Sequence, residues 1–194
     1  MRNTFSEALY EEATRNPDIY LVVADISPAG SMAKFTTQYP DRFINVGVAE
    51  QSMIGICAGL ALKGCQPFAY TIATFSLYRP FEMVRDDLGY QNLPVTVVGM
   101  GAGVIYSTLG GTHHTQEDIA IAGAIPNMQI IAPCDPLECT DADTSLRHAE
   151  DGPDLSAHRQ GRRTGLHQGR RTLEIRQDPL SAPAAPTSAF LHMA

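Results

Sequence analysis

The hydrophobic positions of this chain fall into short continuous runs separated by longer amphipathic or apolar segments. The continuous runs cover residues 19–24, 43–46, 67–72, 95–98 and 128–132, and they are typical of strands buried on both faces. Between them the spacing predicts helices over about 5–13, from 50, over about 75–90, from about 117 and from about 135. This alternation indicates an α/β fold, a mostly parallel sheet sandwiched between helices.

Polar residues that could carry chemistry follow three of these strands. Asp25 comes after the first run, Glu50 comes shortly after the run at 43–46, and a glycine-rich loop at 99–114 follows the run at 95–98. Ligands of parallel α/β sheets bind at the carboxyl ends of the strands, so we expect a site there. Asp25 has a plainer alternative as the carboxylate of a strand-end turn.

Composition narrows the classes of protein. The 194 residues allow one domain with a sizeable core, and a net charge of −7 with a pI near 5.3 excludes a nucleic-acid or membrane footprint. No apolar run has transmembrane length, and the acidic N-terminal region is not a signal peptide. The four cysteines lack CxxC or metal-ligand spacing, which favours reduced thiols in a cytoplasmic protein.

The composition changes abruptly near residue 154. From there the chain carries many arginines among Gly, Gln, Ala and Pro, without apolar periodicity. We therefore predict a folded domain over 1–153 and a disordered, atypical tail over 154–194.

Two motifs carry the candidate chemistry. Asn-Val-Gly-Val-Ala-Glu-Gln at 45–51 places Glu50 at the start of a strongly apolar helix, and Thr-Phe-Ser-Leu-Tyr-Arg-Pro-Phe at 74–81 spaces Phe75, Tyr78 and Phe81 so that three rings share one helix face. A buried carboxylate beside a stacking platform would hold an aminopyrimidine. The alternatives are an ordinary stabilising Glu in a first helical turn and aromatic core packing.

At these motifs the sequence resembles the transketolase family, in its pyrimidine-binding domain, over about residues 2–153. Further matches in the family's order are Arg-Asn-Thr-Phe-Ser-Glu-Ala-Leu from residue 2, Val-Ala-Asp-Ile-Ser around Asp25, Asp-Arg-Phe-Ile-Asn-Val from 41, Gly-Gly-Thr-His from 110 and Ile-Pro-Asn-Met from 125. The first of these is similar to the start of the second subunit of split bacterial transketolases.

The resemblance implies roles for the motif residues. Glu50 would hydrogen-bond N1′ of the aminopyrimidine of thiamine diphosphate and so promote removal of the C2 proton of the cofactor. Tyr78 would stack on that ring, with Phe75 and Phe81 shaping the pocket, and Asp25 would lie near the thiazolium.

The resemblance also implies substrate contacts. His113 would face the substrate as a catalytic residue, and Arg2 would bind its phosphate. His113 and His114 beside Glu117 and Asp118 could also suggest a metal site, but adjacent histidines diverge in most backbone conformations, so we expect no metal there.

Several features depart from the family. Leu109 stands where some members have an Asp that reads a substrate hydroxyl, and Ala29 stands where a Ser helps hold the substrate phosphate. No Gly-Asp-Gly occurs, which is the family's segment for Mg²⁺ and the diphosphate, and the family's C-terminal domain is missing. Classical pentose-phosphate specificity is therefore not expected.

We thus expect part of a split transketolase-like enzyme that transfers a two-carbon ketol unit between sugars. A diphosphate-binding partner subunit would hold Mg²⁺, in a homodimer or heterotetramer. Alternatives are a subunit of 1-deoxyxylulose-phosphate synthase or 2-oxoacid dehydrogenase type, and an inactive truncated product or non-catalytic binding module. A frame shift is a further hypothesis: back-translated and shifted forward by one base, residues 154–168 can read TYLRTGKGGEPGFTR, close to the family's continuation.

Overall fold

A six-stranded parallel sheet forms the centre of the molecule. The computed structural model describes residues 2–26, 30–140 and 188–193. The strands are β1 (Ile19–Val23), β2 (Phe43–Asn45), β3 (Gln66–Ile72), β4 (Thr96–Met100), β5 (Gln129–Ile131) and β6 (Ala189–Met193). Their order is β2-β1-β3-β4-β6-β5, and every neighbouring pair is parallel. The predicted α/β class is confirmed.

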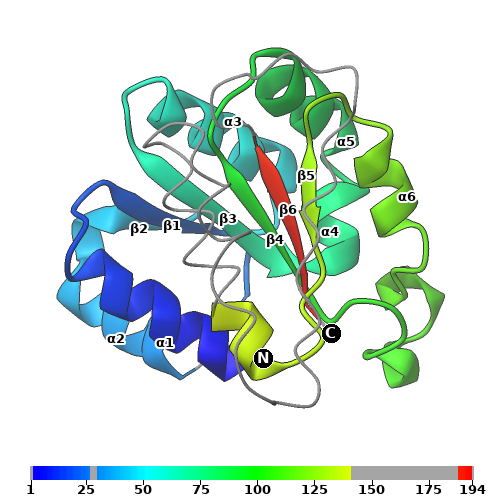
Figure 1. The fold of residues 1–194 in the computed structure, drawn as a ribbon, viewed down its shortest axis with the longest axis horizontal. Helices are drawn as coiled ribbons and strands as arrows, with labels where there is room; N and C mark the ends of the chain where they lie inside the picture. The colour runs from blue at the N-terminus through cyan, green and yellow to red at the C-terminus, as the bar shows by residue number, and fades with distance from the viewer. Residues whose placement is uncertain (1, 27–29, 141–187, 194) are drawn as a thin grey trace, which may run out of the picture.

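Helices cover both faces of the sheet (Figure 1). On one face lie α1 (Arg2–Ala13), α2 (Ser31–Gln38) and a helical turn at 136–140. On the other lie α3 (Glu50–Ala61), α4 (Ala73–Leu77), the π-helix η2 (Val84–Tyr90) and α6 (Asp118–Gly123). The remaining short helices are η1 (Pro40–Arg42), α5 (Phe81–Met83), η3 (Ser107–Leu109) and η4 (Gly111–His113).

The two helical layers explain why the strands read as unbroken apolar runs. Neighbouring strand residues point to opposite faces, so Val22 joins the core cluster under α3 whereas Leu21 and Val23 join the cluster under α1 and α2. Each of these side chains is at most 1% exposed. Both faces must therefore be apolar, which removes the alternation of a half-exposed strand.

The aromatic segment is not the single helix predicted over about 75–90. α4 ends at Leu77, α5 begins at Phe81, and η2 takes the chain from Val84 to Tyr90. Pro80 lies in the break, and proline has no N–H for an internal helical hydrogen bond and clashes with the preceding turn. The prediction of one continuous helix is wrong for this reason.

The end of the chain also differs from the prediction of a disordered tail over 154–194. Ala189–Met193 forms β6, inserted between β4 and β5, with Phe190 and Leu191 completely buried (Figure 1). Disorder is wrong for these residues because their apolar side chains fill a gap in the sheet and join both core clusters. Residues 154–187 and 194 of the predicted tail, including the segment of the frame-shift hypothesis, lie outside the described residues.

The helices described in the structure are short. Within residues 2–26, 30–140 and 188–193, none has both the length and the apolar character that crossing a membrane requires.

Candidate active site

The carboxyl ends of β1 and β2 are tied together by the side chain of Asn45. Its Oδ1 accepts hydrogen bonds from the backbone N–H of Asp25 (3.3 Å) and of Gly47 (3.0 Å). Asp25 is exposed and has a φ of 45°, in the left-handed region that Asp tolerates better than most residues. The loop thus presents Asp25 at the edge where ligands of parallel sheets bind.

Glu50 is a buried carboxylate at the first position of α3. Its residue exposure is 2%, and its Oε1 accepts a hydrogen bond of 2.7 Å from Nη1 of Arg79. Its Oε2 is buried and has no hydrogen-bond partner among the residues that the structure describes. The helix N-terminus and the guanidinium both offset the cost of burying this negative charge. Because buried polar atoms are nearly always paired, the free Oε2 could accept a hydrogen bond from a ligand.

A line of contacts runs from Glu50 to His113. The guanidinium carbon of Arg79 lies 4.3 Å from the centroid of the Phe75 ring. Phe75 in turn meets the His113 ring edge to face, at 5.2 Å and 70°. The structure therefore brings together Glu50, Phe75 and His113, which are far apart in the sequence, with Arg79 between them.

His113 lies on a loop of residues 101–115, which we call the glycine-rich loop. An antiparallel bridge between Gly103 and Thr115 closes the loop, and Ala102 N–H donates to the carbonyl of Met193 in β6. Nδ1 of His113 is 3.0 Å from the hydroxyl of Thr112. These backbone contacts hold a half-buried imidazole beside the Phe75 ring.

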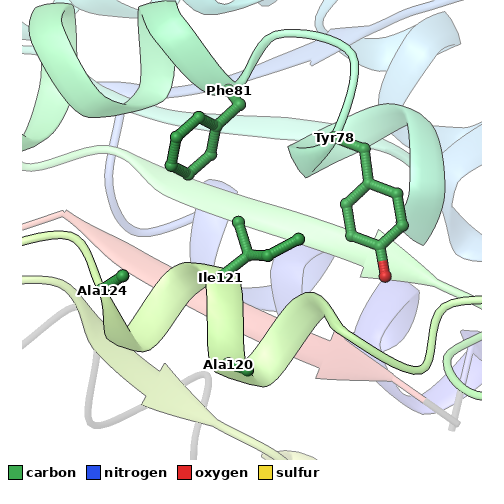
Figure 2. A pocket seen from close by; sticks show the side chains of 5 residues that line it. All are labelled: Tyr78, Phe81, Ala120, Ile121 and Ala124. Carbon is green, nitrogen blue, oxygen red and sulfur yellow. The ribbon is translucent and has the colours of Figure 1, made fainter.

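Tyr78 and Phe81 line a pocket of about 490 Å³ against α6. Figure 2 shows their rings on one side and Ala120, Ile121 and Ala124 on the other. Glu50 does not line this pocket.

The three predicted rings consequently divide between two places. Tyr78 and Phe81 share the pocket, while Phe75 contacts Arg79 and His113. The prediction of a common face is wrong for Phe75, because its ring contacts the Arg79 guanidinium and the His113 ring instead of lining this pocket.

The hydroxyl of Tyr78 makes two hydrogen bonds to Glu117. It donates to the carboxylate oxygen Oε2 at 2.8 Å and accepts from the backbone N–H at 3.1 Å. Partial burial, followed by the hydrogen bond to the Glu117 carboxylate, raises the pKa of Tyr78 to about 12. Tyr78 is therefore a neutral ring fastened at its far end to the start of α6.

Two predicted substrate or cofactor residues stand apart from the line of contacts between Glu50 and His113. Arg2 is the exposed first residue of α1. The start of that helix lies toward the same edge of the sheet as the end of β6 (Figure 1). Burial raises the pKa of Tyr70, and the nearby charge of Arg2 opposes that rise. The line of contacts includes neither Arg2 nor Asp25, and Ala29 lies outside the described residues.

Potential metal ligands gather elsewhere. Within the described ranges, the group of three whose ligand atoms lie within 4.8 Å of one another is Cys134, Asp135 and Glu138. Oδ1 of Asp135 caps the helical turn at 136–140 by accepting from the N–H groups of Leu137 and Glu138. Helix capping accounts for this cluster.

Most of the chain matches the model of one known protein family. The family model described as "Transketolase, pyrimidine binding domain" matches residues 1–154. The chain belongs to the transketolase family. The family resemblance of the motifs is therefore confirmed.

Its relatives include proteins named as transketolase subunits. This transketolase-family chain is 38% identical over 134 residues to an apulose-4-phosphate transketolase subunit of Phocaeicola vulgatus, covering 69% of this chain and 43% of that protein. It is 37% identical over 153 residues to the 6-deoxy-6-sulfo-D-fructose transketolase subunit SqwH of Clostridium sp. (strain MSTE9), covering 79% and 47%. The chain thus spans less than half the length of these relatives.

A solved structure has the same fold. It is described as "Split gene transketolase, inactive beta4 tetramer", and it matches with a TM-score of 0.71 and 26% identity over 99% of this chain and 50% of that one.

Sequence reasoning missed Arg79 as a site residue. A signal was present, since Arg79 is the one charged residue within the aromatic run at 74–81. Its partner Glu50 is 29 positions earlier, and only the fold shows that the two meet.

Proposed function

We propose that this chain is the pyrimidine-binding part of a split, thiamine diphosphate-dependent transketolase that transfers a two-carbon ketol unit between sugars. Proteins of the transketolase family use this cofactor, and the relatives' names point to sugar transketolases. The observation that carries the proposal is the buried Glu50, whose Oε2 lacks a partner among the described residues.

The residues present fit the aminopyrimidine half of the cofactor. Oε2 of Glu50 is an acceptor for a protonated ring nitrogen, and the aromatic rings of Phe75, beside Arg79, and of Tyr78, in the pocket against α6, would offer surfaces for stacking. When bound, thiamine diphosphate would supply a carbon nucleophile and an electron sink for ketol transfer. Glu50 would accept the hydrogen bond that promotes proton removal from the reactive carbon.

The glycine-rich loop would act on the substrate. Because the Thr112 hydroxyl holds Nδ1 of His113, the imidazole would meet a substrate oxygen through Nε2. Asp25 would lie toward the thiazolium, and Arg2 would bind a substrate phosphate at the same edge of the sheet.

A partner subunit would complete the site. The sequence has no Gly-Asp-Gly segment for Mg²⁺ and the diphosphate, and two relatives are named as transketolase subunits. The similar structure described as an inactive β4 tetramer supports the idea that such chains are inactive without a second kind of subunit. We propose a cytoplasmic homodimer or heterotetramer in which the partner holds Mg²⁺ and the diphosphate.

The decisive experiment replaces Glu50 by Gln in the complex of this chain with its diphosphate-binding partner. The amide keeps the size but loses the charged acceptor, so exchange of the C2 proton of thiamine diphosphate should slow by roughly a hundred- to ten-thousand-fold. Glu82→Gln is the matched control, since Glu82 is exposed in the first turn of α5. Exchange near the wild-type rate in Glu50→Gln would refute the proposed role.

A second candidate shares the site but differs in the donor. It is a subunit of 1-deoxyxylulose-phosphate synthase or 2-oxoacid dehydrogenase type, and the observation that favours it is the 37% identity over 139 residues to the 1-deoxy-D-xylulose-5-phosphate synthase of Aquifex aeolicus. Mass spectrometry of the quenched complex, after addition of either a ketose phosphate or pyruvate, separates the two. A cofactor adduct with the ketose alone supports the transketolase, and one with pyruvate alone supports the second candidate.

A further inference from the structure

The two oxygens of the Glu50 carboxylate have different surroundings. Oε1 is 2.7 Å from Nη1 of Arg79, whereas Oε2 is buried without a hydrogen-bond partner among the described residues. The Glu50 side chain is 3% exposed and that of Arg79 is 40% exposed. The ion pair thus reaches from the protein surface to one edge of a buried group.

Arg79 is itself held in direction. Its guanidinium lies over the Phe75 ring at 4.3 Å, a geometry in which the ring face attracts the cation. Arg79 precedes Pro80, whose ring restricts the backbone of the residue before it. An arginine fixed in this way can also fix the carboxylate that it contacts.

We propose that Arg79 is a positioning residue that occupies Oε1 of Glu50 and thereby presents Oε2 to the aminopyrimidine. A carboxylate without this partner could turn about its terminal bond and offer either oxygen in several orientations. The ion pair selects one orientation before the ligand arrives, which lowers the cost of ordering on binding. This inference rests on the proposed function, because it assumes that Glu50 meets the cofactor.

The competing interpretation is that Arg79 fills the place of the ligand and must leave it. The two interpretations predict opposite changes in cofactor affinity when Arg79 is removed. If Arg79 positions Glu50, its removal weakens cofactor binding. If Arg79 competes with the ligand, its removal strengthens binding.

The test measures the affinity of thiamine diphosphate by calorimetry, using the full chain together with its diphosphate-binding partner. Arg79→Gln should weaken binding by about ten- to a hundred-fold, the range for a hydrogen bond to a charged group. Arg79→Lys should recover part of the loss, because lysine keeps the charge but lacks the planar fork. The double variant Arg79→Gln/Glu50→Gln should bind no more weakly than Glu50→Gln alone, since Arg79 acts through Glu50.

The control is Arg85→Gln, which removes an arginine that pairs with Asp86 on the exposed surface at 2.9 Å. Its affinity should equal that of wild type. A second measurement uses the free chain, where the ¹³C signal of the Glu50 carboxyl should move in Arg79→Gln and stay in place in Arg85→Gln. Should Arg79→Gln fail to fold, Arg79→Lys carries both measurements.

Two outcomes overturn the inference: unchanged or tighter binding in the Arg79 variants, and losses that simply add in the double variant. A different result is expected if the proposed function itself is wrong. In that case Glu50→Gln itself leaves the affinity and the C2 exchange unchanged. If Glu50→Gln weakens binding while Arg79→Gln does not, the inference about Arg79 alone is wrong.

Discussion

Two parts of the site are built in different ways. The carboxylate wall, which consists of Glu50, Phe75 and Arg79, is held by contacts between side chains, and its carboxylate begins a helix whose inner face is buried. The glycine-rich loop of residues 101–115 is held mainly by backbone hydrogen bonds and exposes several apolar side chains. The difference indicates that the buried face of α3 anchors the carboxylate wall in the core, whereas residues of the loop can be substituted with little effect on the stability of the rest.

The largest effect on stability is expected in α3, the helix that connects the carboxylate wall to the core. Met53 of α3 is 0% exposed and packs one turn after Glu50, so Met53→Ala should lower the free energy of unfolding by about 2–5 kcal/mol. Urea denaturation monitored by circular dichroism measures this loss in the free energy of unfolding. Ile56→Ala, at the 36% exposed position of the same helix, is the control and should cost much less. Equal losses in the two variants would contradict the idea that the wall is part of the core.

A smaller effect on stability is expected in the glycine-rich loop, where two glycines allow a matched comparison. Gly101 and Gly103 have φ values of 72° and 63°, so alanine at either should cost about 1–2 kcal/mol. A Cβ on Gly101 would also clash with the Tyr106 ring, whereas a Cβ on Gly103 meets nothing within 4 Å.

Only Gly101→Ala should therefore displace Tyr106, whose ring lies 6.3 Å from that of His113. NMR signals of His113 should move in Gly101→Ala and stay near wild type in Gly103→Ala. Indistinguishable spectra for the two variants would mean that Tyr106 does not support the imidazole.

The link between the pocket and α6 should respond to alkaline pH. The folded chain raises the pKa of Tyr78 from 10.0 to about 12, so between these values it binds more protons than the unfolded chain. The resulting stabilisation is present below about pH 10 and is lost as the pH rises through about 12.

Tyr78→Phe should therefore reduce the fall in stability over this range, and it should cost under about 1 kcal/mol near neutral pH. Melting temperatures from pH 8 to 12 measure both effects, with Tyr90→Phe as the exposed control. If wild type and Tyr78→Phe lose stability in parallel, the hydrogen bond to Glu117 is not maintained in solution.

The smallest effect on stability is expected at Leu109. The residue is 54% exposed on the loop, so Leu109→Asp should change the free energy of unfolding by less than about 0.5 kcal/mol. In the assembled enzyme the new carboxylate should improve kcat/KM selectively for 2-hydroxyaldehydes over their 2-deoxy forms. A wild-type enzyme that already discriminates strongly between these substrates would show that this part of the loop does not read the hydroxyl.

Sequence reasoning succeeded where one local pattern determined the outcome. The apolar helix after Glu50 buries the start of α3, so the carboxylate could be placed at the edge of the core. It failed to predict α2, because Ser31–Gln38 is only eight residues long and is held by contacts of Met32 and Phe35 with the core that only the fold shows. Arg79 was missed because its ion pair joins residues that only the fold brings together.

The position of β6 has a consequence for the order of folding. Strands β1 to β4 and their pairings lie within residues 19–100, but β4 pairs on its other side with Ala189–Met193. Contacts between such distant segments form slowly, since a long loop must close before they stabilise anything. Until β6 docks, β4 has a free edge carrying the apolar Val97 and Val98, to which the same edge of a second copy can pair. Aggregation during refolding should therefore depend on the rate at which β6 closes the sheet.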